Sequence, residues 1–388
     1  MRYRTRDIRP PPIVKLAEVA KKYIGSSNFL DLGQGVSGHI PPNSVLSALG
    51  ERIYHPATHR YTPNQGHLEL REELALYLRQ SSGIDIDPEG ELTITAGGNQ
   101  AFASTILTLV EPGDEVIMPS PYYFNSVMAV QLAGGIVKEV PVNHEFQPTP
   151  HAIEEAITDR TKCVLLVSPN NPTGAVYDQR TVDHIVDICL QNDIILISDE
   201  AYARLVFDDH THYSPRKRRD ASENVIVLGS FSKDFGISGW RIGYTIGSHE
   251  FMEEFLKVQD TISICAPTGG QILALEALKS DLTWVEDEIN RLSHLREFAY
   301  LRIREIDALE TVETKGTFYL FPKVKGCRDS RALVLDILQS TETLVLPGSV
   351  FGEAGEGHVR ISIGPLTPDA VNTAFDRLAN FFASYSSE

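Results

Sequence analysis

The stretch VIVLGSFSKDFGISGWRIGY, residues 225–244, joins a short apolar run to a turn that carries a lysine. The run at 225–228 is rich in β-branched residues and predicts a strand buried on both faces. Lys233 follows at the carboxyl end of this strand, where open α/β sheets bind their ligands. Arg241 comes shortly afterwards, so the segment places a reactive amine near a group that binds anions.

Six similar apolar runs lie on either side of residues 225–228. They alternate with helical patterns, such as the apolar stripe within residues 180–191. This alternation of strand and helix predicts an α/β fold in which a mostly parallel sheet is covered by helices. The six runs are residues 92–95, 115–118, 136–140, 163–167, 194–198 and 242–246.

The pattern changes near residue 280, where a long charged helical stretch leads into shorter strand-like runs. A chain of 388 residues is longer than the chains that usually fold around a single hydrophobic core, so we expect two domains. The larger domain is predicted at residues 45–280. A smaller α+β domain is predicted at residues 281–388 and is completed by residues 1–44.

The composition is that of a globular protein with a strongly acidic balance. A net charge of −17 argues against general binding to nucleic acids or to anionic membranes. The four cysteines form no CxxC pair, so neither a metal site nor a disulfide framework is expected, and free thiols fit a cytoplasmic protein. Residues 1–22 contain no apolar segment of the kind found in secretory signals.

Residues with unusual chemistry gather just after the predicted strands. Glycines that open a helix after residues 92–95 offer backbone N–H groups to an anion, and an acid follows the strand at 194–198. Each feature alone has an ordinary explanation as a turn or as core packing. Together they predict a site for a flat ring with a protonated nitrogen, a phosphate and an aldehyde, which is pyridoxal 5′-phosphate. The candidates are Gly98, Asn99, Tyr123, Asn171, Asp199, Tyr202, Ser230, Lys233 and Arg241.

Four motifs identify a family by resemblance. They are SPNNPTG at 168–174, SDEAY at 198–202, SFSKDFGISGWRIGY at 230–244 and HVRISIG at 358–364. In this order the chain resembles the class I/II aminotransferases, pyridoxal-phosphate enzymes of fold type I. The resemblance implies a mostly parallel seven-stranded sheet flanked by helices, with a smaller α+β domain. It also implies a ping-pong transfer of an α-amino group between an amino acid and a 2-oxo acid, and a homodimer with shared active sites.

The resemblance further implies a role for each matching residue. Lys233 would form the Schiff base and move the proton at the donor Cα, and Asp199 would pair with the pyridine nitrogen. Tyr202 and Asn171 would contact the phenolic oxygen of the cofactor, and Tyr123 would contact the face of its ring. The phosphate would be bound by Gly98, Asn99, Ser230 and Arg241, and Tyr61 would reach the phosphate of the neighbouring subunit. The residues implied for the substrate are Gly35, Asn171 and Arg360. Arg360 is the residue expected to bind the α-carboxylate.

One segment departs from the aspartate-specific members of the family. Residues 261–264, Thr-Ile-Ser-Ile, stand roughly where those enzymes carry an arginine for the side-chain carboxylate of the substrate. We therefore expect a neutral, aromatic or sulfur-containing amino acid as the donor. A C–S β-lyase or a related pyridoxal-phosphate enzyme stays open as the alternative, because the motifs define the cofactor and not the bond that breaks.

Two other motifs have weaker functional interpretations. Residues 33–38 satisfy GxGxxG, but Pro41 and Pro42 block the helix that a dinucleotide site requires, so no such site is expected. The basic run PRKRRD, residues 215–220, is predicted to be a solvated loop rather than a nucleic-acid site.

Overall fold

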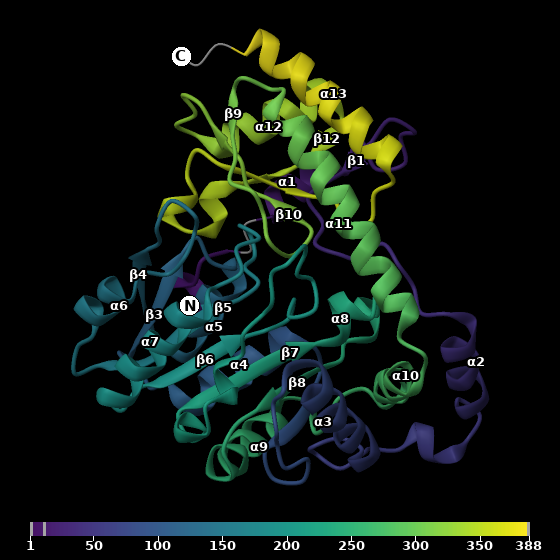
Figure 1. The fold of residues 1–388 in the computed structure, drawn as a ribbon, viewed down its shortest axis with the longest axis vertical. Coiled ribbons are helices and arrows are strands. Elements are labelled where there is room, and N and C mark those ends of the chain that lie inside the picture. The colour runs from purple at the N-terminus through teal and green to yellow at the C-terminus, as the bar shows by residue number, and fades with distance from the viewer. Residues whose placement is uncertain (1–2, 11–12, 386–388) are drawn as a thin grey trace.

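The computed structural model describes residues 3–10 and 13–385. Its centre is a seven-stranded sheet with helices on both faces, which confirms the predicted α/β fold (Figure 1). Neighbouring strands are parallel except at β8, which runs antiparallel to both of its neighbours. In spatial order the strands are β2 (Leu92–Thr95), β8 (Gly243–Ile246), β7 (Val225–Ser230), β6 (Ile195–Asp199), β5 (Thr161–Val167), β3 (Glu115–Ser120) and β4 (Ile136–Pro141).

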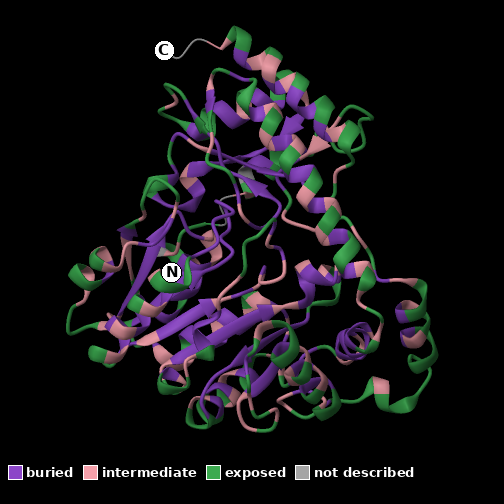
Figure 2. Cartoon of the chain, in the orientation of Figure 1, coloured by how far each residue is buried: buried purple, intermediate pink, exposed green. Residues whose placement is uncertain are grey.

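All seven apolar runs of the sequence are strands of this sheet, and apart from the edge strand β4 their residues are mostly buried (Figure 2). In β7, Val225 and Val227 pack into one core, whereas Ile226 and Leu228 pack into the core on the opposite face. The helices of the first core are α2 (Asn43–Arg52), α3 (Leu68–Ser82), α6 (Pro150–Ala156), α7 (Gln179–Gln191) and α10 (Thr268–Lys279). The helices on the second face are α4 (Gly98–Leu109), α5 (Phe124–Ala133) and α9 (His249–Ser263).

Strands β5, β6 and β7 end at the same level of the sheet. Val167 pairs with Asp199, and Asp199 pairs with Leu228. The segments that follow the three strands therefore meet at one edge, where the short helix α8 (Phe231–Asp234) also begins. This is the edge at which α/β sheets bind ligands and at which the sequence places the candidate residues.

A third apolar core lies beyond this edge and is built mainly from the C-terminal part of the chain. The N-terminal segment joins it, because β1 (Leu30–Asp31) pairs with β12 (Thr343–Leu344). The other elements are α1 (Val14–Ala20), α11 (Thr283–Arg304), β9 (Leu309–Glu310), β10 (Tyr319–Leu320), β11 (Lys323–Val324), α12 (Ser330–Thr341), β13 (Leu346–Pro347), β14 (Val359–Ser362) and α13 (Pro368–Ser384). Strands β10, β14 and β13 form an antiparallel sheet, as expected of a small α+β unit.

The division into a domain at residues 45–280 and a second one at 1–44 and 281–388 stays a prediction. Residues 1–2, 11–12 and 386–388 of the second domain lie outside the described part of the chain. In Figure 1, α11 extends from the region of α12 and α13 toward α10, so this long helix connects the two regions.

The basic run at residues 215–220 differs from the solvated loop that its charge predicts. Arg216 is buried, and its Nη2 lies 2.6 Å from Oε1 of Glu91. Nη2 of Arg218 lies 2.5 Å from Oδ2 of Asp220. The prediction was wrong for Arg216 because a partner distant in sequence neutralises its charge and permits its burial.

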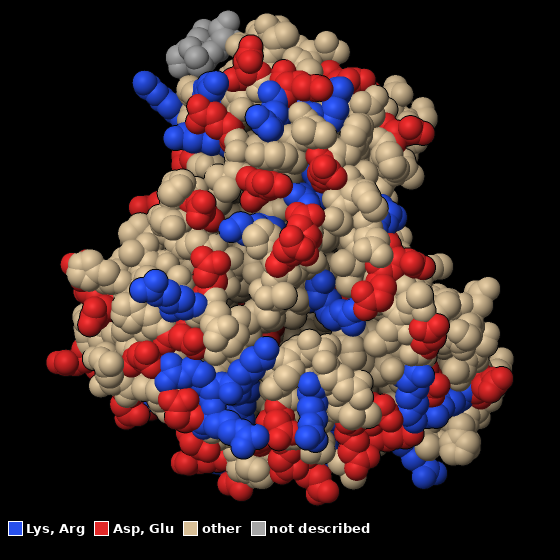
Figure 3. All heavy atoms as spheres, viewed as in Figure 1, with Lys and Arg blue, Asp and Glu red and all other residues tan. Residues whose placement is uncertain are grey.

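Acidic and basic side chains are interspersed over the face shown in Figure 3.

The GxGxxG segment opens no helix, as expected. Residues 33–42 have no helical turn, and α2 begins only at Asn43. Within residues 3–10 and 13–385, no helix is both long enough and apolar enough to cross a membrane. The same residues contain no cluster of His, Cys, Asp or Glu arranged to hold a metal ion.

Candidate active site

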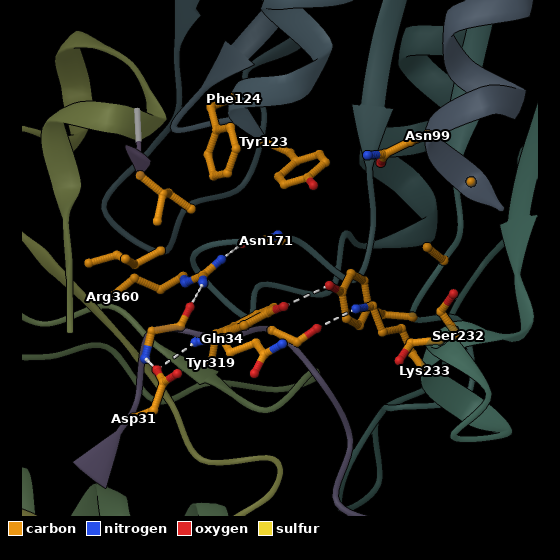
Figure 4. Close-up of a pocket in the computed structure, with 18 of the residues that line it drawn as sticks. Asp31, Gln34, Asn99, Tyr123, Phe124, Asn171, Ser232, Lys233, Tyr319 and Arg360 are labelled. Atoms are coloured by element: carbon orange, nitrogen blue, oxygen red, sulfur yellow. Dashed lines mark hydrogen bonds between the residues drawn. The ribbon is translucent and has the colours of Figure 1, made fainter. Parts of the chain in front are cut away.

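A cavity of about 520 Å³ opens at the carboxyl edge of the large sheet, facing the small β10–β14–β13 sheet (Figure 4). With the exception of Tyr61, all site residues expected from the sequence line it. The structure therefore brings together side chains from segments far apart in the chain. These residues are Gly35, Gly98, Asn99, Tyr123, Asn171, Asp199, Tyr202, Ser230, Lys233, Arg241 and Arg360.

Lys233 lies in α8, a single helical turn directly after β7. Ser230 caps this turn, because its Oγ accepts a hydrogen bond of 3.1 Å from the N–H of Ser232. The Lys233 Nζ donates a hydrogen bond to the carbonyl oxygen of Gly35. Burial, together with the nearby Arg360 and Arg241, lowers the pKa of Lys233 from 10.5 to about 8. The neutral amine, which is the nucleophilic form, is therefore accessible at mildly alkaline pH.

Asp199 is the last residue of β6, and its side chain borders the same cavity. Its Oδ1 accepts a hydrogen bond of 3.1 Å from the N–H of Ala201. Loss of solvation raises the pKa of Asp199 from 3.8 to about 6, and the Ala201 N–H and Lys233 oppose this rise only in part. A carboxylate in this position favours a ligand that brings its own positive charge.

One end of the cavity is suited to an anion. Gly97 precedes α4 with φ +83°, and a Cβ atom there would lie 2.3 Å from Nη2 of Arg241. The positive φ favours glycine, and the absence of a side chain lets the guanidinium approach the backbone. Gly98 and Asn99 at the start of α4, the Ser230 side chain and the Arg241 side chain line this part of the cavity. A helix N-terminus beside a hydroxyl and a guanidinium is well suited to a phosphate group.

Arg360, in β14, is buried at the other end of the cavity (Figure 4). Its Nη1 donates to Oδ1 of Asn171 at 3.0 Å, and its Nη2 donates to the carbonyl oxygen of Gly33 at 2.5 Å. The guanidinium carbon lies 4.4 Å from the centre of the Tyr319 ring. These contacts fix the plane of the guanidinium, which is the geometry that binds a carboxylate through two parallel hydrogen bonds.

Tyr319 is a site residue that the motifs did not single out. Its hydroxyl lies 2.8 Å from that of Tyr202. Burial raises the pKa of Tyr202 well above its ordinary value, so this phenol stays protonated. The available signal was a polar ring inside the apolar run at 317–324, which is weak without the fold. Tyr123 and Phe124 lie on the opposite side of the cavity in Figure 4.

The cavity also has an apolar wall that the sequence did not predict. It is formed largely by the N-terminal segment, which packs beside β12 and β13. Its residues are Ile13, Ala17, Ala20, Ile24, Phe29, Phe124, Leu344 and Leu346. Among the described residues that line the cavity, the basic side chains are Lys233, Arg241 and Arg360, and the acidic ones are Asp31 and Asp199.

Tyr61 lies apart from the cavity of its own chain. Its side chain is 78% exposed. The preceding residue, Arg60, accepts a hydrogen bond of 3.1 Å from Oγ1 of Thr268 through its carbonyl oxygen. Ile262 and Ile264, in the segment 261–264 where an arginine was not found, are also exposed and do not line the cavity.

The residues of the cavity fit pyridoxal 5′-phosphate. Asp199 is an anion whose raised pKa reports the lack of a full cationic partner, which the ring nitrogen would supply. Gly97 lets the Arg241 guanidinium lie against the start of α4, at the end suited to a phosphate. Lys233 is close enough for the charges of both Arg241 and Asp199 to act on it, and it carries the amine that an aldehyde requires.

Comparison with protein families gives a match over most of the chain. A family model described as "Aminotransferase class I and II" matches residues 27–378. An aspartate aminotransferase of Pyrococcus abyssi is 34% identical over 96% of this chain and 95% of that protein. An aromatic-amino-acid aminotransferase of Thermococcus litoralis is 33% identical, again over 96% of this chain and 95% of its own length.

Solved structures of aminotransferases also match this chain over most of its length. A double mutant of Thermus thermophilus aspartate aminotransferase superposes with a TM-score of 0.91 at 30% identity, covering 98% of this chain and 100% of that one. An aromatic aminotransferase from Pyrococcus horikoshii has a TM-score of 0.88 at 33% identity, with 94% and 98% coverage. The similarity extends over both the large sheet and the C-terminal region.

Proposed function

The chain belongs to the class I and II aminotransferase family and is therefore a pyridoxal-phosphate-dependent aminotransferase; from this premise we propose the roles of its residues and the nature of its amino donor. Lys233 holds the cofactor, and Asp199 pairs with the ring nitrogen. Arg360 binds the α-carboxylate of the substrate. The observation that carries this assignment is that a lysine with a pKa of about 8 lies in one cavity with Asp199 and Arg360.

The remaining residues orient the cofactor and its substrate. Asn99, Ser230 and Arg241, together with Gly98, hold the phosphate at the N-terminus of α4. Tyr123 packs against the ring, while Tyr202 and Asn171 donate to its phenolic oxygen. Gly35 lies in the loop that borders the α-carboxylate. All of these residues line the cavity, which supports the proposed roles.

The bound cofactor supplies an electron-accepting ring and a carbonyl group that receives the amino group. The protein supplies the proton transfers. Arg360 would fix the donor by its carboxylate and so present the Cα–H to Lys233. The neutral amine of Lys233 would remove this proton and deliver it to the carbon that carried the aldehyde of the cofactor. Asp199 keeps the ring nitrogen protonated by its charge. A 2-oxo acid then occupies the same Arg360 subsite, which gives ping-pong kinetics.

We further propose a neutral, aromatic or sulfur-containing donor. The three basic side chains at the cavity already serve the cofactor and the α-carboxylate, so none is left for a second carboxylate among the described lining residues. Asp31 would repel such a carboxylate, and the apolar wall would bury an uncharged side chain. The matched relatives are named as aminotransferases, which does not favour the C–S β-lyase alternative.

A homodimer and a cytoplasmic location are also part of the proposal. Tyr54, Tyr61 and Ile262 are more than half exposed on the large unit, and a second copy of the chain would bury them. Tyr61 would then contact the cofactor phosphate of the partner, as the family resemblance implies. The free cysteines fit a reducing compartment.

The test is a panel of donors assayed with 2-oxoglutarate and with pyruvate as acceptors. Phenylalanine, methionine and leucine are expected to give a kcat/KM at least about tenfold above that of aspartate, the difference expected from one unpaired carboxylate. A clear preference for aspartate would overturn the proposed donor class. Release of pyruvate and ammonia from a cysteine conjugate, faster than transfer, would instead favour the lyase.

A further inference from the structure

We propose that His39 is a positioning residue of the amino-transfer site, and that it fastens the loop at residues 33–39 both to the turn that carries Lys233 and to α11. The proposal rests on the proposed function, because it takes Lys233 and Arg360 as the groups that act on substrate. No part of the chemistry described above uses His39. Its side chain is 11% exposed and lies outside the cavity.

The first contact joins His39 to the lysine turn. Its Nε2 lies 3.1 Å from the carbonyl oxygen of Asp234, the residue that follows Lys233. Because a carbonyl oxygen only accepts, Nε2 must carry the proton. The two backbones also approach closely, since a Cβ atom on Gly236 would lie 2.4 Å from the carbonyl oxygen of His39. Gly236 has φ +63°, so this turn depends on glycine.

The second contact joins His39 to α11. Its Nδ1 lies 3.4 Å from Oε1 of Glu288, whose side chain is 6% exposed. Burial opposes the ionisation of Glu288, but bonds from Arg291 and His39 lower its pKa to about 2. Arg291 in turn donates to the carbonyl oxygen of Gly364 at 2.6 Å, just beyond β14, the strand that carries Arg360.

The loop at residues 33–39 contacts both ends of the active site. The carbonyl oxygen of Gly35 accepts from Lys233, and that of Gly33 accepts from Arg360. Ser362 of β14 holds the middle of the loop through the Gln34 carbonyl oxygen, and His39 anchors its far end. Release of His39 would loosen the loop on the side of Lys233 and let the lysine and the arginine move relative to each other. A shift of about 1 Å in such a constellation is enough to weaken binding and turnover.

The two nitrogens of the imidazole face different elements. Nε2 donates to the Asp234 carbonyl oxygen, and Nδ1 lies beside the Glu288 carboxylate. The Trp284 ring also packs beside it, with its centre 5.5 Å from that of His39, and the Glu288 carboxylate is shared with the Arg291 guanidinium. Substituting Glu288 removes the contact with α11 and leaves the contact with Asp234, and it also neutralises the partner of Arg291.

The experiment compares His39→Ala, His39→Gln and Glu288→Gln with the wild-type holoenzyme. Glutamine retains an amide donor for the Asp234 carbonyl oxygen, and Glu288→Gln removes the carboxylate charge that faces His39 and Arg291. The readouts are KM and kcat for the best donor and acceptor. A third readout is the Kd of a 2-methyl amino acid, which lacks a Cα hydrogen, followed by the change in cofactor absorbance. His151→Ala is the control, because His151 forms an exposed pair with Glu155.

For His39→Ala we expect KM and Kd to rise about tenfold with kcat within about threefold of wild type, since the loop affects substrate placement first. His39→Gln should recover most of this loss, and Glu288→Gln should cause a smaller rise that is not additive with His39→Ala. Unchanged KM and Kd in His39→Ala, or a loss of thermal stability alone without rescue by glutamine, would overturn the proposal. If His39→Ala does not fold, the Gln variants at both positions decide by the same criteria. A wild-type enzyme that transfers no amino group from any donor would instead refute the proposed function.

Discussion

Nη1 of Arg360 donates a hydrogen bond of 3.0 Å to Oδ1 of Asn171, a residue 189 positions away in the sequence. Asn171 belongs to the loop that follows β5 of the large sheet, whereas Arg360 belongs to β14 of the small one. The bond thus connects the two sheets at the cavity. It also orients the arginine that we propose for the α-carboxylate.

Replacing this arginine tests the carboxylate subsite. Arg360→Ala should lower kcat/KM by about 100-fold or more for every donor and every 2-oxo acid, because two charge-assisted hydrogen bonds are lost. Arg360→Lys should recover only part of this, since an ammonium cannot form two parallel bonds. Steady-state kinetics with two donors and two acceptors measure the effect. A loss confined to one donor would show that Arg360 binds a side chain instead.

The lowered pKa of Lys233 predicts when its amine reacts. The neutral form grows as pH rises through about 8, rather than near 10.5, because burial, Arg360 and Arg241 disfavour the ammonium. The cofactor-free protein is reductively methylated at a series of pH values from about 6 to about 10, roughly two units on either side of the expected midpoint. Mass spectrometry should show Lys233 reacting with a midpoint near 8. Arg360→Ala should raise that midpoint. The exposed Lys162 serves as the internal reference.

Much of this site follows from the sequence because of one property of parallel sheets. Strands rich in β-branched residues were predicted, and the residues after them meet because β5, β6 and β7 end together. Tyr319, the apolar wall and the contact of His39 with Glu288 were not predicted. They arise where the N-terminal and C-terminal segments pack on each other, and no local pattern encodes that contact. Arg216 was misread for the same reason, since its partner Glu91 is distant in the chain.

A mixing experiment tests the shared active site. Tyr61 is exposed in the single chain, so we expect it to act at the phosphate of a partner. Tyr61→Ala and Lys233→Ala should each be impaired alone. Co-expressed, they should form mixed dimers with one intact site, giving about a quarter of wild-type activity when subunits combine at random. Activity no higher than the sum of the two variants would contradict a site built from both chains.

Asp199→Asn should separate function from stability. The folded-state pKa of about 6 lies above the ordinary 3.8, so folding disfavours the ionised carboxylate, and this cost is full above pH 6 and disappears below about 4. Asparagine removes the charge, so the cofactor-free variant should be more stable than wild type at pH 7.5, by on the order of 1 to 2 kcal/mol, with no difference near pH 4.

The same substitution should lower transamination by about 10² to 10⁴-fold, because the ring nitrogen loses the anion that keeps it protonated. Urea unfolding of the cofactor-free proteins at the two pH values measures the first effect, and single-turnover absorbance of the holoenzyme measures the second. Asp178→Asn is a suitable control, since Asp178 precedes α7 and does not line the cavity. A variant that is both fully active and no more stable would show that Asp199 meets its cationic partner within the protein and not on the cofactor.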